Sequence, residues 1–159
     1  MTTATLPREI LKDSDRETVV GSLQTCLTTL IDLSLQLKQL HWNVLGDRFL
    51  SFHTQLDKII DTSRAGADEV AERIAALGVT ADGRAMTIAD ESRLEALTAG
   101  RQSVDESVTA AADRLLVATQ CLRDSMDKIG NVDKVSEDIL IEFCRALEKH
   151  LWMVQSQER

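Results

Sequence analysis

Two pairs of potential metal ligands lie on one predicted helix of this sequence. His53 and Asp57 are four residues apart, and Asp68 and Glu72 repeat that spacing with two carboxylates. Side chains four residues apart lie one turn from each other on one helix face, so each pair could hold a metal ion. Each pair alone also fits a plainer reading, as a surface His–Asp hydrogen bond or as two solvated acids beside arginines.

The two pairs are too far apart to act together within one chain. His53 and Asp68 are 15 residues apart, which is about 22 Å along a helix. Metal–ligand distances are only about 2 to 2.5 Å. A second copy of the helix, packed antiparallel about a two-fold axis, would bring the first pair of one chain to the second pair of its mate. The spacing therefore predicts a site shared by two subunits.

The predicted crossing point of the two helices lies near position 62 or 63. The run from Thr62 to Ala67 there consists mostly of small residues, which would let two backbones approach closely. A glycine inside a helix costs about 1 kcal/mol relative to alanine. We expect close packing between subunits to be the reason for Gly66.

His41, near the end of the preceding predicted helix, would complete a set of two imidazoles and three carboxylates. Mixed nitrogen and oxygen ligation suits Fe(II), whereas a site made only of carboxylates would favour Mg(II), Ca(II) or Mn(II). Zinc is the expected competitor. The ligand types thus indicate iron as the metal.

Four long segments with apolar residues at helical spacing would carry these ligands. They run from Ser14 to about Gly46, Arg48 to Leu77, Gln102 to Ile129 and Lys134 to Gln157. Ser14 with Glu17 has the pattern of a capping box, Thr87 with Asp90 suggests a short helix, and Gly78 has the position of a helix-ending glycine. We predict an all-α four-helix bundle with a short extra helix between the second and third long helices.

The 159 residues, 43% of them hydrophobic, suit one compact domain. We expect residues 1–13 to form a short N-terminal tail and residues 14–159 to form the single bundle domain. The cysteines are scattered without CxxC spacing, so we interpret them as small buried apolar residues rather than as redox or zinc thiols; they are Cys26, Cys121 and Cys144.

The charge and hydropathy of the chain exclude several classes of partner. A formal charge of −8 argues against a nucleic-acid binder, which needs a basic face or tail. No stretch approaches the roughly 18 to 20 uninterrupted apolar residues of a membrane span, and no secretory signal precedes the first helix. We therefore expect a cytoplasmic protein without a membrane partner.

The ligand residues and their surroundings closely resemble the signature of the Dps family of miniferritins. The resemblance rests on the run His41-Trp42-Asn43-Val44, on the ligand spacings 12, 4, 11 and 4, and on Arg73-Ile74-Ala75-Ala76-Leu77-Gly78. It extends to the short extra helix and to the stretch Leu147–Trp152 near the C-terminus. The larger ferritins place Glu-x-x-His motifs inside one bundle, and this chain contains none.

The resemblance implies how the ligands are divided and what they do. His41, His53 and Asp57 would form one subunit's half of a ferroxidase site, and Asp68 and Glu72 would come from the two-fold mate. It also implies a homo-oligomer of twelve subunits, a tetrahedral cage that stores a ferric mineral and protects against oxidative stress. H2O2 would be the favoured oxidant of Fe(II), with O2 as a second one.

Three further residues carry two readings each, and a fourth carries one. The resemblance makes Trp42 an electron donor beside the site, while a tryptophan in a helix is as readily a core residue. It makes Asp133 and Asp138 part of an iron-entry pore, while acids at a helix start also favour the helix dipole. We interpret His150 as structural, because it lies on another helix from the ligands.

Two other functions compete with ferroxidase activity. Some members of the family condense DNA through a lysine-rich tail, but the first 17 residues here hold three basic and four acidic side chains. Twelve such subunits would carry a formal charge of about −96, which opposes binding to phosphates, so we expect no DNA binding. A shell that has lost its activity is the other alternative, and the complete ligand set argues against it.

Overall fold

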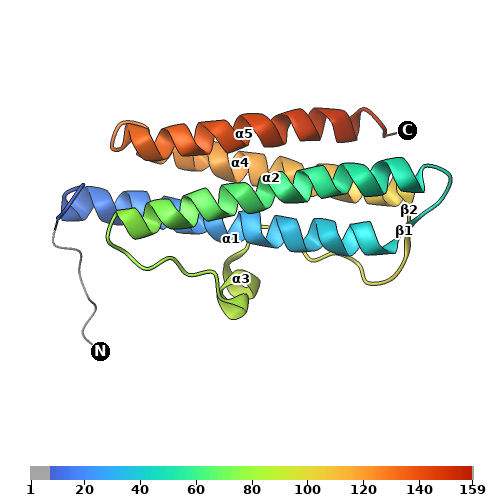
Figure 1. Cartoon of the computed structure of the whole chain (residues 1–159), viewed down its shortest axis with the longest axis horizontal. Helices are drawn as coiled ribbons and strands as arrows, with labels where there is room; N and C mark the ends of the chain where they lie inside the picture. Colours follow the sequence, from blue (N-terminus) through green and yellow to red (C-terminus); the bar gives the residue numbers. More distant parts are fainter. Residues whose placement is uncertain (1–7, 159) are drawn as a thin grey trace.

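The computed structural model describes residues 8–158 and contains four long helices and one short one (Figure 1). The long helices are α1 (Asp13–Asn43), α2 (Phe49–Ala76), α4 (Val104–Ile129) and α5 (Lys134–Gln155), and the short one is α3 (Ala85–Glu91). The predicted four-helix bundle with a short helix between the second and third long helices is confirmed. Residues 1–7 of the predicted tail lie outside the described residues.

The helices follow an arrangement with one long crossover (Figure 1). α1 and α2 are antiparallel neighbours joined by a short turn, whereas residues 77–103 run back along the whole bundle and carry α3. α4 therefore runs parallel to α2, and α5 returns antiparallel to both. In this square, α1 packs against α2 and α4, and α5 packs against the same two helices. The short first turn places the end of α1 beside the start of α2, where three of the predicted ligands lie.

A two-residue parallel bridge joins the two connections at one end of the bundle. Strand β1 (Val44–Leu45) pairs with strand β2 (Gln102–Ser103), with Val44 opposite Gln102. The apolar pattern predicts a helix from about Gln102, whereas α4 begins at Val104, and no sequence pattern predicts the bridge. Gly46 follows β1 with a φ of +130°, a conformation that glycine adopts without strain. The bridge fixes where the chain turns from α1 into α2.

The predicted capping box at Ser14 and Glu17 is wrong. α1 begins one residue earlier, after an extended Lys12, and has no side-chain cap. A cap residue must have non-helical backbone, whereas Ser14 already lies in the first helical turn. The capping box is instead at the start of α4, where Ser103 and Glu106 bond each other's backbone N–H groups. The Ser-x-x-Glu pattern was present there in the sequence.

Sequence patterns also predict the start of α3 and the end of α2. Thr87 lies inside α3, which begins after an extended Arg84 without a side-chain cap, so the start proposed from Thr87 and Asp90 is wrong while the helix itself is confirmed. Gly78 follows α2 with a φ of +84°, the left-handed conformation expected of a helix-ending glycine.

A row of leucines along α1 lies in the bundle core. Leu23, Leu27, Leu30, Leu33 and Leu37 are 0–2% exposed. By length and composition alone α1 is apolar enough to cross a membrane, which the sequence reading did not anticipate, but 56% of its most apolar window is buried inside the protein. This burial is what the core helix of a bundle shows. The three cysteines are free and buried, as predicted.

A buried ion pair ties the end of α2 to the start of α5. Arg73 Nη2 lies 2.7 Å from Asp133 Oδ2, and Arg73 Nε donates to Ser136 Oγ at 2.9 Å. The same aspartate caps α5 by accepting the N–H of Val135. Burial acts to raise the pKa of Asp133, but the hydrogen bonds from Ser136 and Arg73 outweigh it and lower that pKa below its usual value.

Replacing this carboxylate should destabilise the bundle in a pH-dependent way. In Asp133→Asn the guanidinium of Arg73 loses its partner while only 11% exposed, so we expect a loss of about 3 kcal/mol at pH 7 in denaturant unfolding. Because the folded-state pKa is lowered, the stabilisation is present above about pH 4 and is lost as pH falls through the folded pKa. Asp138→Asn, on the exposed surface of the same helix, is the control. Equal losses from the two variants would contradict this role.

Candidate metal centre

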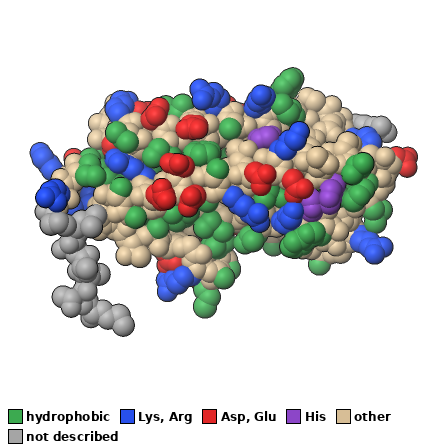
Figure 2. Space-filling view, in the orientation of Figure 1, with side chains coloured by type: hydrophobic (Ala, Val, Ile, Leu, Met, Phe, Trp, Pro, Cys, Tyr) green, Lys and Arg blue, Asp and Glu red, His purple; other side chains and the backbone are tan. Residues whose placement is uncertain are grey.

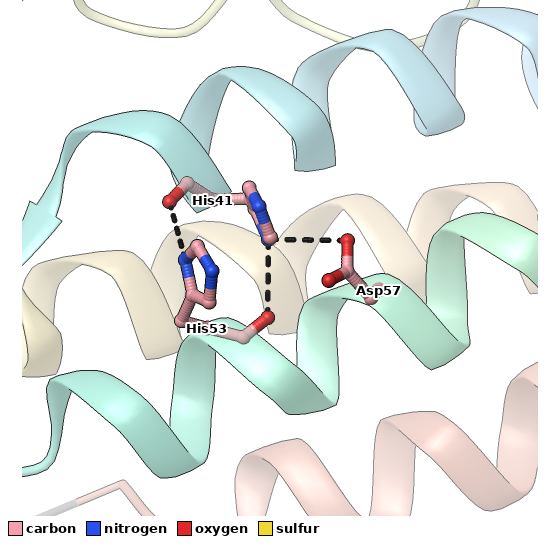
Figure 3. Close-up of side chains that lie close together, drawn as sticks. All are labelled: His41, His53 and Asp57. Atoms are coloured by element: carbon pink, nitrogen blue, oxygen red, sulfur yellow. Dashed lines mark hydrogen bonds and ion pairs between the residues drawn. The ribbon is translucent and has the colours of Figure 1, made fainter.

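His41 and His53 face each other across α1 and α2 and are held by each other's backbone. His41 Nδ1 donates to the carbonyl of His53 at 3.1 Å, and His53 Nδ1 donates to the carbonyl of His41 at 2.9 Å (Figure 3). The rings stack with their centroids 3.5 Å apart. Because a carbonyl can only accept, each Nδ1 carries the hydrogen and each Nε2 keeps its lone pair. Both rings are therefore fixed in the tautomer that can bind a metal.

Asp57 completes a three-residue cluster with the two histidines. Its Oδ1 lies 3.2 Å from His41 Nδ1 (Figure 3). One potential ligand atom from each of the three residues lies within 4.8 Å of the others. Since Zn–N and Zn–O bonds, for comparison, are about 2.0 to 2.2 Å long, atoms this close can meet on one ion.

The protonation states suit a divalent cation. Burial lowers the pKa of His41, although the bond to the carbonyl of His53 partly opposes that effect. A hydrogen bond from Lys38 lowers the pKa of Asp57. At neutral pH the cluster therefore offers neutral imidazole and ionised carboxylate, which are the forms that coordinate metals.

Lys38 is a residue of this site that the sequence reasoning missed. Its Nζ lies 2.7 Å from Asp57 Oδ1. The signal was available, because Lys38 precedes His41 by three residues on the same helix and so shares its face. In this structure the ammonium group of Lys38 bonds the carboxylate oxygen of Asp57 that a metal ion would use.

The other two predicted ligands, Asp68 and Glu72, lie apart from this cluster. Both are exposed on α2, and Asp68 is about 16 Å further along the helix than Asp57. Neither carboxylate forms an ion pair within residues 8–158. Acidic side chains gather on this face of α2, between the histidines and the far end of the helix (Figure 2). One chain thus brings together three of the five predicted ligands.

The expected reason for Gly66 is wrong. Gly66 is buried inside its own bundle, and a Cβ there would lie 3.0 Å from the ring of Phe143 on α5. Ser63 is also fully buried, and its hydroxyl bonds the carbonyl of Ile59 in its own helix. These small residues therefore make room for α1 and α5 of the same chain, and they say nothing about a second subunit.

The structure also places the remaining predicted residues. Trp42 is 68% exposed, so the reading of Trp42 as a core residue does not hold within one subunit. Asp133 is committed to its internal ion pair, whereas Asp138 is exposed. His150 bonds Thr62 Oγ1 through Nε2 at 3.1 Å and lies between α2 and α5, away from the cluster.

Known proteins resemble this chain over nearly its full length. The model of the ferritin-like domain matches residues 21–158. The DNA protection during starvation protein of Mycolicibacterium smegmatis is 35% identical over 156 residues, which cover 98% of this chain and 84% of that protein.

Solved structures agree with the sequence matches. The tetragonal form of Mycobacterium smegmatis Dps has a TM-score of 0.90 and 35% identity, and the match covers 98% of this chain and 93% of that one. Dps from Microbacterium arborescens in the high iron form has a TM-score of 0.88 and 28% identity, with 94% and 97% covered. The fold is thus the ferritin-like four-helix bundle, and the chain belongs to the Dps family of miniferritins.

Proposed function

We propose that this protein is an iron-storage and detoxification ferroxidase, which oxidises Fe(II) at sites shared between two subunits. The observation that carries the proposal is the division of the ligands. Two imidazoles and one carboxylate converge, while two further carboxylates on the same helix stay out of their reach. A two-fold mate with an antiparallel α2 would supply Asp68 and Glu72 to the half-site of its partner.

Iron is the substrate that fits these ligands. Two imidazole nitrogens and three carboxylate oxygens form a mixed set that suits Fe(II), and zinc remains the expected competitor for it. The name of the Microbacterium arborescens relative, a Dps in a high iron form, supports the same assignment. Membership of the family supports a role in iron storage and in protection against oxidative stress.

The proposed reaction is 2 Fe(II) + H2O2 + 2 H⁺ → 2 Fe(III) + 2 H2O. Transferring two electrons as a pair avoids the hydroxyl radical that one-electron reduction of peroxide releases. The carboxylates would offset the rising charge of the oxidised metal, and the carbonyl-bound imidazoles would keep the ligand geometry constant. Trp42, exposed and next to His41 in sequence, is the proposed one-electron donor, and O2 is the second oxidant.

The proposed assembly is a cytoplasmic homo-oligomer of twelve subunits, with the ferric mineral inside. Asp138 is the proposed pore residue of the pair singled out from sequence, because its carboxylate is exposed. Asp133 is the weaker candidate for that role, because its carboxylate already pairs with Arg73.

The bond between Lys38 and Asp57 should compete with metal binding. In Lys38→Met a divalent cation no longer has to displace the ammonium group from the carboxylate. Exposed ion pairs are worth about 0.2 to 1 kcal/mol, so we expect Co(II), titrated by visible absorption, to bind up to about fivefold more tightly. Lys128→Met on α4 is the matched control for the lost charge. Weaker binding by the Lys38 variant would mean that the ammonium holds Asp57 in place for the metal.

DNA should not bind to the intact protein. The chain carries a formal charge of −8, and its residues 1–17 hold three basic and four acidic side chains, so long-range repulsion from phosphates should oppose binding. At physiological salt and neutral pH, linear DNA should keep its mobility in a gel shift. A variant extended at its N-terminus by several lysines serves as the positive control. A salt-sensitive shift by the unmodified protein would contradict the prediction.

Mixing two damaged chains should restore part of the ferroxidase activity. One chain carries His53→Ala and Asp57→Ala, and the other carries Asp68→Ala and Glu72→Ala, so neither alone can form a complete shared site. In a mixed dimer one of the two sites combines both undamaged halves. With random pairing, about a quarter of the wild-type sites should return.

The measurement is stopped-flow oxidation of Fe(II) by H2O2 and by O2, on assemblies shown to be mixed by mass spectrometry. Each parent should assemble normally and oxidise Fe(II) slowly. A site inside one subunit predicts no recovery, because every chain keeps its own damage. Mixed assemblies as inactive as the parents would therefore rule out the shared site.

A further inference from the structure

A pocket with basic side chains in its wall lies between α2 and α5, apart from the histidine cluster. It has a volume of about 670 Å³, and its charged and titratable lining residues are Lys58 on α2 with Lys149 and His150 on α5. No acidic residue lines it. Figure 2 shows basic side chains on both sides of a histidine along the seam between these helices. In a chain with a formal charge of −8, this pocket is a local concentration of positive charge.

Neither lysine of the pocket is neutralised by the protein. Among residues 8–158, no carboxylate lies within 4.0 Å of the ammonium group of Lys58 or Lys149. Lys38 and Lys134, by contrast, each bond a carboxylate at 2.7 Å. The two pocket lysines therefore keep their donors available for an anion.

The amide of Gln55 adds an uncharged donor to the same wall. Its Oε1 accepts a hydrogen bond from Gln157 Nε2 at 2.7 Å, and that nitrogen also donates to the carbonyl of Met153 at 2.9 Å. Because Gln157 Nε2 can only donate, the oxygen of the Gln55 amide must be the end that faces Gln157. The Nε2 of Gln55 has no bond to any other described residue and remains free to donate.

His150 lines the same pocket as the two lysines. Thr62 Oγ1 donates its hydrogen to the carbonyl of Lys58, so it must accept from His150 Nε2, which therefore carries a hydrogen. Nδ1 is buried and has no partner in the described part of the chain. Burial lowers the pKa of His150, and the charges of Lys149 and Lys58 lower it further. Lys58, Lys149 and His150 all line the same pocket, and no acidic residue lines it.

We propose that this pocket binds a tetrahedral oxyanion, inorganic phosphate, between Lys58 and Lys149 with the Gln55 amide as a third donor. Phosphate offers several acceptor oxygens, and its hydrogen bonds to charged donors are the strong kind. Phosphate binding at this pocket requires no iron, so the proposal can be tested independently of ferroxidase activity. A phosphate held there would present its outer oxygens to hydrolysing Fe(III), for which phosphate is a strong ligand.

The test is a calorimetric titration of the intact, assembled, iron-free protein with inorganic phosphate, in phosphate-free buffer at constant chloride. We expect saturable binding of one phosphate per chain. Losing a hydrogen bond to a charged group should weaken binding about tenfold in Lys58→Gln and in Lys149→Gln. Lys128→Gln removes the same charge from α4, outside the pocket, and should bind like the unmodified protein. Circular dichroism and assembly size check that each variant is folded.

Two results would overturn the proposal. Absence of saturable binding would show that these lysines are ordinary solvated side chains, or that assembly covers the pocket. Equal weakening in Lys128→Gln and Lys149→Gln would show that phosphate responds only to the net charge of the protein. A ferroxidase assay on the same variants separates the two sites, because neither lysine belongs to the metal centre.

Discussion

The candidate metal centre depends on the reciprocal hydrogen bonds between the imidazoles and the backbone carbonyls of His41 and His53. Each bond orients a ring, selects its tautomer and joins α1 to α2 at the same time. The other elements of the bundle position the two histidines for this contact. The short turn and the β1–β2 bridge bring the two helix ends together, and the buried leucines of α1 keep them in register. The reciprocity also requires both histidines, since each ring is held by the main chain of the other.

The sequence predicted most of this arrangement because apolar spacing and ligand spacing are local properties. The four long helices, the short α3 and the turn at Gly78 follow from residues near one another in the chain. What it could not predict depends on contacts between distant segments. The β1–β2 bridge and the ion pair of Arg73 with Asp133 have partners about 60 residues apart, and no pattern along the chain marks such pairs.

Gly66 shows how a correct observation can receive a wrong reason. Its position in a helix required an explanation by close packing, and the structure supplies one within the chain, where Phe143 fills the space that a Cβ would take. Lys38 shows the opposite case, since its spacing from His41 was visible but its bond to Asp57 depends on how α1 and α2 meet. The division of the five ligands was predictable, because the length of a helix follows directly from residue number.

At the proposed metal site, the bond between Lys38 and Asp57 would make metal loading an exchange of one cation for another. Within one subunit, the carboxylate of Asp57 already has a counter-charge in the ammonium group of Lys38. The binding free energy of an incoming ion is then the difference between two pairings rather than the full strength of one. The metal affinity of such a site can change through Lys38, which is not itself a ligand, while the ligands remain unchanged.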